Sequence, residues 1–335
     1  MIRKLVQIAA VLLLAGLPVR PAAAADDVAP PLHADDAAVV KRILANEGRP
    51  VDPAEMPGWS RGGLVERLKA LGVPEAAGPL KAWGVADRDK KAQAIHFLYG
   101  ADGHVLAIGA NGPWLRNDSL RALKGMPRLR IVRVDHNGTL DKATTDLYDG
   151  SGFDALADSQ LLEVKIGLSF SDRGMEQAAK VKSLRSFAVA HSRVTDAGVR
   201  FFEGHPALES FSVGEMASGR VTPKALASIA KMPKVTQVGF REAVVAYADG
   251  LAHLAPMKGR LRELDLSMCL VAEPDLAKLR ADHPDVKVTV LPAAEIVKRH
   301  RGVAQSLART APPELAADLK AALAAAPAGS PKKDR

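Results

Sequence analysis

The sequence has little cysteine, few aromatic residues and no long hydrophobic run after its first 25 residues. Cys269 is the single cysteine among 335 residues, so the chain has no internal disulfide and must be stable through its packed core. Aromatic residues make up 4% of the chain and hydrophobic residues 47%, which is enough for a large, mainly aliphatic core. Since no later apolar stretch is long enough to span a bilayer, we expect no transmembrane segment in the mature chain.

The motifs that usually carry chemistry are also missing. The nine histidines show no H-E-x-x-H or similar ligand spacing, and the chain has no P-loop, no G-x-S-x-G elbow and no G-x-G-x-x-G turn after a strand. His205-Pro206 and His283-Pro284 take equivalent turn positions in two repeats, which favours a structural role for both. We therefore expect a protein that is not an enzyme, with no catalytic residue, no metal site and no cofactor. The alternative, a hydrolase, would need a pocket that joins a histidine to an acid and a nucleophile.

The first 25 residues have the pattern of a Sec-type export signal. Arg3 and Lys4 precede an apolar run from Leu5 to Leu17, and small residues follow up to Ala25. A membrane anchor is the alternative, but a run of about a dozen apolar residues is short for a bilayer span. No cysteine lies near the expected cleavage site to carry a lipid. The pattern predicts a periplasmic or extracellular protein.

The formal net charge is +8, and much of the excess lies near the C-terminus. Basic residues cluster in Lys298-Arg299-His300-Arg301 and in Lys332-Lys333-Asp334-Arg335. Such clusters fit contact with an anionic cell envelope better than a nucleic-acid site, although solvated ends without a partner would show the same pattern.

One apolar pattern recurs along the middle of the chain. Apolar residues spaced as apolar-x-x-apolar-x-apolar occur seven times, and the starts of these copies lie 23 to 32 residues apart. The copies are Val105/Ile108/Ala110, Leu129/Val132/Val134, Leu161/Val164/Ile166, Leu184/Phe187/Val189, Leu208/Phe211/Val213, Val235/Val238/Phe240 and Leu261/Leu264/Leu266. A last, degenerate copy lies in residues 286–290, and the longest interval predicts an insertion between Asn137 and Leu161.

A second pattern leads into several of these copies. Apolar residues recur at every third position over about ten residues, as in the run from Leu120 to Leu129, which indicates a short helix before the strand. Side-chain oxygens suited to cap such helices mark the expected starts. These starts are Asp118, Asp172, Asp196 and the pair Thr222-Pro223. Gly174 and Gly198 take the same place in two successive units.

The segment Val194-Thr195-Asp196-Ala197-Gly198-Val199, followed by the strand pattern from Leu208 to Val213, resembles the ribonuclease-inhibitor-like and cysteine-containing leucine-rich repeats of secreted bacterial proteins. Units of this family carry a T-D-x-G-L helix start, and an Asn or Cys at a ladder position three residues after the last apolar strand residue. The ladder position here holds Asn137, Ser169, Ser192, Met216, Ala243 and Cys269. Asn137 and Cys269 fit the family, whereas the side chains of Met216 and Ala243 cannot make the ladder hydrogen bond.

The resemblance covers residues 105 to 291 and implies an α/β fold, a leucine-rich-repeat solenoid. In such a solenoid a parallel sheet lines the concave side and short helices line the convex side, because one strand and one helix cannot bury their apolar faces alone. The resemblance is specific for the fold and nearly silent about function.

The expected order of parts follows from these patterns. Residues 1–25 are the signal peptide, 26–93 a helical N-terminal region, 94–291 the repeats with a hairpin cap, 292–310 a capping helix and 311–335 an Ala/Pro/Lys-rich tail, largely disordered. The Ala-rich stretch 319–326 of this tail indicates a weak helix before the disordered end. Asp102-Gly103 predicts the turn of the hairpin. Helical patterns at about 36–46 and 63–71 are expected to pack on the first repeat, with Trp59 and Trp83 as apolar anchors.

In this fold the residues between the apolar strand positions line the concave face. They are charged in the early and late repeats and small in the central ones, which would let a partner approach the sheet closely, although small residues also accumulate on a face with no partner. The candidate partner-binding residues are Arg133, Asp135, Lys165, Ser186, Ser210, Ser212, Gln237, Arg241 and Asp265. No tryptophan or tyrosine falls on these inner positions, which disfavours a glycan.

These observations predict a monomer whose concave face binds a protein or peptide. The alternative from a different class is a structural or surface-associated protein of the cell envelope, held to anionic polymer by its basic C-terminal segment.

Overall fold

The computed structural model describes residues 32–44, 49–50, 59–86, 94–111, 115–135, 148–214 and 219–326. The expected signal peptide, most of the expected insertion and the basic end of the chain lie outside these residues, as do the side chains of Trp59 and Asp135. No helix in the described part of the chain has the length and apolar composition of a membrane span.

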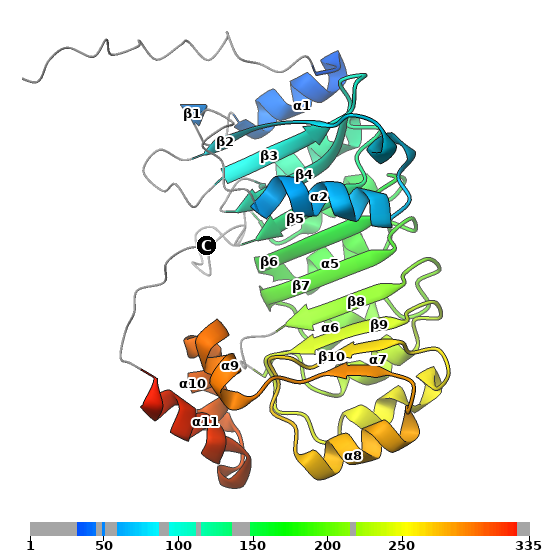
Figure 1. Cartoon of the computed structure of the whole chain (residues 1–335). Coiled ribbons are helices and arrows are strands. Elements are labelled where there is room, and N and C mark those ends of the chain that lie inside the picture. Colours follow the sequence, from blue (N-terminus) through cyan, green and yellow to red (C-terminus); the bar gives the residue numbers. More distant parts are fainter. Residues whose placement is uncertain are drawn as a thin grey trace, which may run out of the picture. The chain divides into compact units, whose positions relative to one another are not determined.

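The described strands form one sheet in which each strand pairs with the next along the chain (Figure 1). The strands are β1 (Arg49–Pro50), β2 (Lys81–Ala86), β3 (Ala94–Tyr99), β4 (Val105–Asn111), β5 (Ile131–Asp135), β6 (Glu163–Ser171), β7 (Ser186–Arg193), β8 (Ser210–Gly214), β9 (Gln237–Arg241), β10 (Glu263–Asp265) and β11 (Lys287–Thr289). Strands β1 to β4 pair in antiparallel fashion, and all pairs from β4 to β11 are parallel.

The register of the parallel strands confirms the apolar pattern. The middle apolar residue of each copy lies beside that of the next, and all seven are buried. These residues are Ile108, Val132, Val164, Phe187, Phe211, Val238 and Leu264. Because a slip of one residue would turn each set to the other face, the pattern alone fixes this register.

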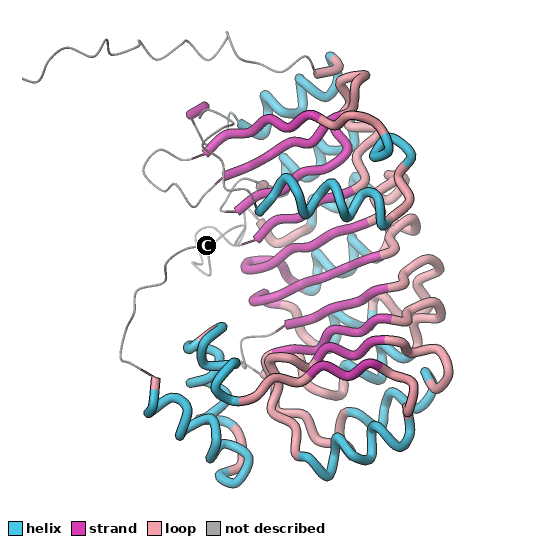
Figure 2. Tube along the Cα trace, in the orientation of Figure 1, coloured by secondary structure: helices cyan, strands magenta, loops and turns pink. Residues whose placement is uncertain are grey.

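Short helices lead into the strands and cover one face of the sheet (Figures 1 and 2). They are α3 (Asn117–Ala122), η3 (Leu123–Gly125), η4 (Ser151–Leu156), α5 (Asp172–Ala178), α6 (Asp196–Arg200), α7 (Ala225–Ala230), η5 (Leu251–Met257) and α8 (Glu273–Asp282). The repeated unit is therefore one short helix followed by one parallel strand, with a continuous apolar core between the two layers.

The N-terminal region combines helices with strands that the sequence pattern did not predict. Helix α1 (Ala34–Leu44), α2 (Trp59–Ala70) and the single turn η2 (Pro74–Ala77) alternate with β1 and β2. The β3–β4 hairpin turns at Asp102-Gly103 as expected, with Gly103 at φ +81°. Trp83 on β2 stacks on Phe97 of β3, with 5.8 Å between ring centroids, so it packs against the core.

Two of the expected helix caps, Asp172 and Asp196, lie one residue after the observed N-caps. Asp118 is the second residue of α3, and Thr222-Pro223 precede the start of α7 at Ala225. Thr195 is the residue that caps α6, because its hydroxyl accepts a hydrogen bond from the Ala197 N–H at 3.1 Å. Asp172, at the first position of α5, instead accepts hydrogen bonds from the Thr195 N–H and hydroxyl, both at 2.7 Å. Asp196 accepts the same pair of hydrogen bonds from Thr222 of the next repeat. The Thr-Asp pair therefore joins successive repeats as well as capping a helix.

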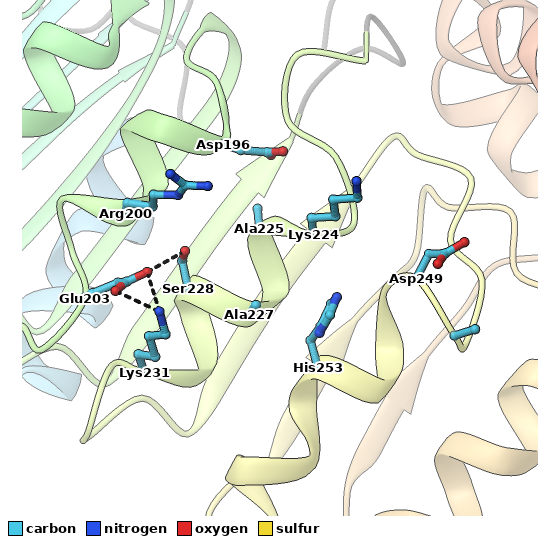
Figure 3. A pocket seen from close by; sticks show the side chains of 11 residues that line it. Asp196, Arg200, Glu203, Lys224, Ala225, Ala227, Ser228, Lys231, Asp249 and His253 are labelled. Atoms are coloured by element: carbon cyan, nitrogen blue, oxygen red, sulfur yellow. Dashed lines mark hydrogen bonds and ion pairs between the residues drawn. The ribbon is translucent and has the colours of Figure 1, made fainter.

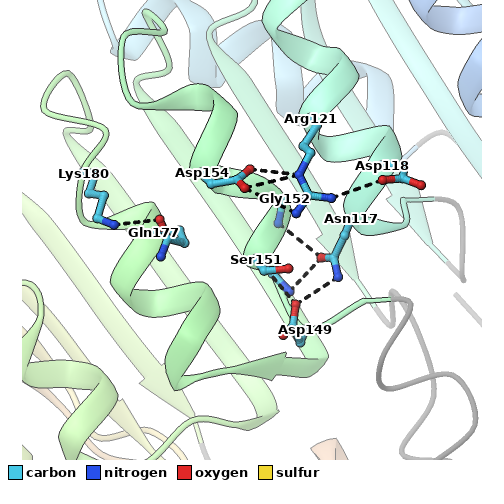
Figure 4. Close-up of polar contacts among 10 residues, drawn as sticks. Asn117, Asp118, Arg121, Asp149, Ser151, Gly152, Asp154, Gln177 and Lys180 are labelled. Atoms are coloured by element: carbon cyan, nitrogen blue, oxygen red, sulfur yellow. Dashed lines mark hydrogen bonds and ion pairs between the residues drawn. The ribbon is translucent and has the colours of Figure 1, made fainter.

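A polar cluster lies where the chain returns from the expected insertion to the helix layer (Figure 4). The amide of the buried Asn117 donates to the Asp149 carboxylate at 2.9 Å and accepts from the Gly150 and Gly152 N–H groups at 3.2 and 3.3 Å. Asp149 also accepts from the Ser151 N–H at 2.8 Å. These hydrogen bonds give partners to loop N–H groups that no helix or strand hydrogen bond satisfies, and they hold the loop against α3.

Gly174 lies at a close approach between two repeats. A Cβ atom there would lie 2.6 Å from the Asp149 carbonyl oxygen and 2.8 Å from the Phe170 ring. We expect Gly174→Ala to destabilise the chain by about 1–3 kcal/mol, because the repeats must move apart. Gly63→Ala in α2 is the matched control, since nothing lies within 4 Å of its Cβ, and it should stabilise the helix by up to about 1 kcal/mol. Denaturant unfolding measures both, and equal stability of Gly174→Ala and wild type would contradict this packing.

The C-terminal end differs from the expected single helix and disordered tail. Helices α9 (Ala293–Arg299) and α10 (Arg301–Thr310) are separated at His300, and α11 (Pro313–Ala325) follows within the segment expected to be disordered. Leu319 of α11 is fully buried against Val303 and Leu307 of α10, in a cluster that includes Met268 and Leu270. A weak helix was expected in this Ala-rich stretch, but its packing on α10, in which the two helices bury each other's apolar faces, was not. The rest of the tail lies outside the described residues.

Candidate functional site

The sheet face opposite the short helices was predicted to be exposed. Helix α2 covers part of it and lies in front of the sheet in Figure 1. Leu64 and Leu68 of α2 belong to a second apolar cluster that includes the inner residue Ile131 of β5. One salt bridge fastens the helix, because Arg67 contacts the buried carboxylate of Glu163 on β6. The same carboxylate pairs with Arg133 of β5 at 2.8 Å within the sheet. Helix α2 therefore packs on the sheet face, whereas α1 packs against α3 and η3 of the first repeat, as predicted.

Beyond α2, the strand ends of β6 to β9 form a pocket of about 260 Å³. It is lined by Lys165, Ile166, Gly167, Leu168, Ala188, Val189, Ala190, His191, Ser212, Gly214, Arg241 and Glu242. Its floor consists largely of the small residues expected on the inner face. The volume is slightly below the range of about 300–1,000 Å³ that is common for small-molecule sites, so the pocket fits one side chain or chain end of a larger partner.

Close packing explains two of the small residues without any ligand. A Cβ at Gly167 would lie 2.5 Å from the Ala190 carbonyl oxygen, and a Cβ at Gly239 would lie 2.3 Å from the Ser212 hydroxyl. The glycines therefore let neighbouring strands approach. Gly214 is different, because a Cβ there would make ordinary contacts at 3.5 to 3.9 Å with Ala190, Arg241 and Glu242.

The rim of the pocket contains three non-glycine residues with positive φ. They are Leu168 (φ 51°), His191 (φ 51°) and Glu242 (φ 67°). Gly167, Ala190, Gly214 and Arg241 lie side by side on β6 to β9, and each of the three residues directly follows a member of this row. A β-bulge between β6 and β7 leaves His191 as the extra residue. Side chains other than glycine adopt this backbone conformation at a cost of about 1–3 kcal/mol, and such residues concentrate at functional sites. The bulge turns the His191 side chain toward the pocket.

His191 and Glu242 form a salt bridge across the pocket. The His191 Nε2 and Glu242 Oε1 atoms lie 2.8 Å apart, although β8 separates their strands, and Glu242 is buried. The His300 ring lies edge-on to His191, with 5.8 Å between centroids, so the C-terminal helices bound the pocket at this end. The pocket thus joins a histidine to an acid, and Ser212 is the hydroxyl that lines it. The Ser212 hydroxyl lies beside the Gly239 backbone of β9.

Two cationic side chains line opposite sides of the pocket. Lys165 comes from β6, and Arg241 comes from β9, where its guanidinium is paired with the Asp265 carboxylate of β10. Burial raises the pKa of Asp265, but hydrogen bonds from Ser267 and the charge of Arg241 outweigh it and hold this pKa below its ordinary value. Asp265 is therefore ionised at neutral pH and keeps Arg241 in a fixed place.

The structure separates the nine candidate residues into groups. Lys165, Ser212 and Arg241 line the pocket, and Asp265 holds Arg241. Ser186 is buried, Ser210 is half-buried and Gln237 is exposed on the same face. Arg133 pairs with Glu163 under α2, so it serves the packing of that helix. The strand position of Asp135 is described, but its side chain is not. His191 and Glu242 were missed, because neither a bulge nor a positive φ is visible in residues of these types.

Cys269 has the structural role that its ladder position predicts. Its thiol donates to the Phe240 carbonyl oxygen at 3.1 Å in the preceding repeat, and burial raises its pKa to about 12. Ser169 and Ser192, at the same position of earlier repeats, are buried too, while Asn137 and Met216 lie outside the described residues.

We expect this thiol to resist labelling by a disulfide reagent at pH 8 in the native chain, because thiolate is the reactive form and burial suppresses it. In denaturant the same thiol should react completely. The native pKa is above the unfolded value, so the contribution to stability is present at neutral pH and is lost as pH rises above about 9. Rapid labelling of the native chain would contradict the ladder role.

The described basic cluster belongs to the C-terminal helices. Lys298 and Arg299 both contact Glu295, and Arg301 donates to the Leu323 carbonyl oxygen at 3.1 Å. The His300 imidazole caps α10 by accepting from the Val303 N–H at 3.2 Å. These bonds give the cluster a role within the fold, and the second cluster lies outside the described residues.

A larger depression of about 590 Å³ lies on the helix face, between α6, α7 and η5 (Figure 3). Its charged groups largely hold the repeats together. Asp196 is bonded to Thr222, and Glu203 accepts from the Ser228 hydroxyl at 2.8 Å and pairs with Lys231 at 3.1 Å. Since these groups already have structural partners, the smaller pocket on the sheet face is the better candidate site.

The fold is an α/β architecture in which short helices alternate with the parallel strands of one sheet. Comparison with protein families finds no matching family, and comparison with curated proteins finds no match. Among solved structures, an internalin from Listeria monocytogenes strain 4b F2365 is similar over 74% of this chain and 79% of its own, with 12% identity and a TM-score of 0.29.

Proposed function

We propose that this chain is an exported leucine-rich-repeat protein, not an enzyme, that binds a protein or peptide on its open sheet face. The observation that carries the proposal is the pocket at the ends of β6 to β9, which has small residues on its floor and residues of positive φ on its rim. Export is supported by the sequence pattern of residues 1–25. The ribonuclease-inhibitor-like subtype is supported by the Thr-Asp pairs that join successive repeats.

The position of the pocket favours a chain-like partner. Helix α2 covers the sheet at one end and His300 bounds the pocket at the other, which leaves a strip of exposed strand between them. Gln237 and Glu263 are exposed on this strip. Gln237 lies between Ser210 and Glu263 in one row across β8, β9 and β10. A peptide lying along the strip would insert one side chain into the pocket.

The charged groups around the pocket favour a polar group of the partner at that point. Lys165 and Arg241 stand on opposite sides, while Arg241 is paired with Asp265 and Glu242 with His191. Charged groups in fixed places give specificity more than raw affinity. We therefore expect a partner that inserts a polar side chain or a chain end.

The test compares variants of the exported chain in capture experiments on its own cell-envelope proteome, read by mass spectrometry. Lys165→Glu reverses a charge in the pocket, and Ala188→Trp fills it. Lys224→Glu makes the same charge change on the helix face and is the matched control. We expect wild type and Lys224→Glu to capture the same protein and the two pocket variants to lose it. Equal capture by all four chains would place the binding surface elsewhere, and capture by none would remove the proposal.

A further inference from the structure

We propose that His33, Asp36 and His104 form a binding site for one divalent transition-metal ion, with zinc as the best fit. His33 immediately precedes α1, Asp36 lies in its first turn, and His104 follows the turn of the β3–β4 hairpin. The site lies in the N-terminal region and shares no residue with the pocket proposed for partner binding.

The donor atoms are already close together. One ligand atom from each side chain can be chosen so that all three lie within 4.8 Å of one another. The His104 Nδ1 and Asp36 Oδ1 atoms are 3.3 Å apart, and the two imidazole rings stack with 4.1 Å between centroids at an angle of 23°. Ligands of a tetrahedral zinc ion with bonds of about 2.1 Å lie roughly 3.4 Å apart. The widest pair therefore has to close by about an ångström, and the exposed His33 ring has room to move.

The carboxylate is held ready for a cation. Asp36 is fully buried, and its Oδ2 accepts the Val105 N–H at 2.5 Å, which leaves Oδ1 directed at His104. A buried carboxylate is costly unless a positive group or several hydrogen bonds compensate it. A metal ion bound at Oδ1 would supply that compensation.

The backbone of His33 is fixed by its surroundings, while its ring stays exposed. The His33 N–H donates to the Gly103 carbonyl oxygen at 3.0 Å, which ties the start of α1 to the hairpin turn. The Asp35 carboxylate lies 3.5 Å from the His33 Nδ1. A carboxylate behind a ligating imidazole orients the ring and makes its other nitrogen a better ligand. Asp35 therefore leaves the His33 Nε2 for the metal.

The donor set selects the kind of metal. Two imidazole nitrogens and one carboxylate oxygen suit zinc and related ions, whereas calcium and magnesium prefer oxygen ligands throughout. Three protein ligands leave a fourth position to water, on the side where His33 is exposed. Because the ligands come from α1 and from the hairpin, the bound ion would clamp the cap of the first repeat.

The test is isothermal titration of zinc into the untagged, chelator-treated full chain. We expect one zinc ion per chain, and an affinity at least about 100-fold lower in His33→Gln and in His104→Gln, since each removes a direct ligand. His253→Gln, on the helix face, is the matched control and should bind as wild type. The exposed position of His33 keeps the test valid even if His104→Gln fails to fold. Cobalt bound in place of zinc should give the strong visible absorption of a tetrahedral site.

Two results would overturn the proposal. One is a wild-type chain that binds no zinc in stoichiometric amount, in which case His104 and Asp36 form a salt bridge alone. The other is equal binding by wild type and His33→Gln, which would locate the zinc at another site.

Discussion

Replacing Phe187 with alanine is expected to destabilise the chain by about 3–5 kcal/mol, the usual cost of removing a buried aromatic ring. Phe187 is fully buried in the middle of the sheet, and its ring centroid lies 4.6 Å from that of Phe202, 5.9 Å from that of Phe211 and 6.2 Å from that of Phe170. The cavity would open between three consecutive repeats. Since each repeat is stable only through its neighbours, the loss should weaken the chain on both sides of β7.

Phe201→Ala is the matched control, because Phe201 has 47% of its surface exposed and adjoins Phe202 in sequence. Surface substitutions of this kind change stability by less than about 0.5 kcal/mol. Urea unfolding followed by circular dichroism measures both variants. A loss below about 1 kcal/mol for Phe187→Ala would contradict the packing of adjacent repeats.

Lowering the pH from 7 to 4 is expected to remove about 3 kcal/mol of stability through His96 alone, at about 1.4 kcal/mol for each pKa unit. Burial on β3 lowers the pKa of His96 from 6.5 to about 4. The unfolded chain therefore takes up a proton near pH 6.5, whereas the native chain does so near pH 4. Stability is complete above pH 6.5 and falls as the pH drops through this window. Burial also lowers the pKa values of His205 and His283, which act in the same direction.

The measurement is the free energy of unfolding of wild type and His96→Leu at pH 7 and at pH 4. The comparison uses the difference between the two pH values within each variant, which cancels the direct effect of the substitution on packing. We expect this difference to be smaller in His96→Leu by about 3 kcal/mol. The same pH dependence in both chains would show that His96 is accessible to protons in the native state.

The sheet was predictable from sequence because its pattern is local and repeated. A strand position that must be apolar on one face recurs in each unit, so Phe187, Phe211 and Val238 could be placed in one row without any structure. The ladder position of Cys269 followed from the same register. Asp196 was predicted as a cap one residue too late, because in the Thr195-Asp196 pair either side-chain oxygen could serve the helix and contacts between repeats decide the choice.

The candidate site was less predictable because it depends on contacts between distant segments. The helical pattern near residues 63–71 was visible, but its packing on the sheet face depends on Leu68 meeting Ile131 and on Arg67 meeting Glu163. The pocket rim depends on a bulge at His191, a residue type with no strong preference for positive φ. His33 and His104 are 71 positions apart in sequence, so no motif could join them.

The central claim is that the strands stack in parallel with one face left open to solvent, and cross-linking of cysteine pairs tests it most directly. In a Cys269→Ser background, Ser210→Cys with Gln237→Cys places two thiols on neighbouring strands in one register row. Dibromobimane, which joins only thiols in close proximity, should link this pair rapidly in the native chain. Ser210→Cys with Glu263→Cys lies two strands apart, at about 10 Å, and should not be linked. Linking of the second pair, or none of the first, would contradict the account.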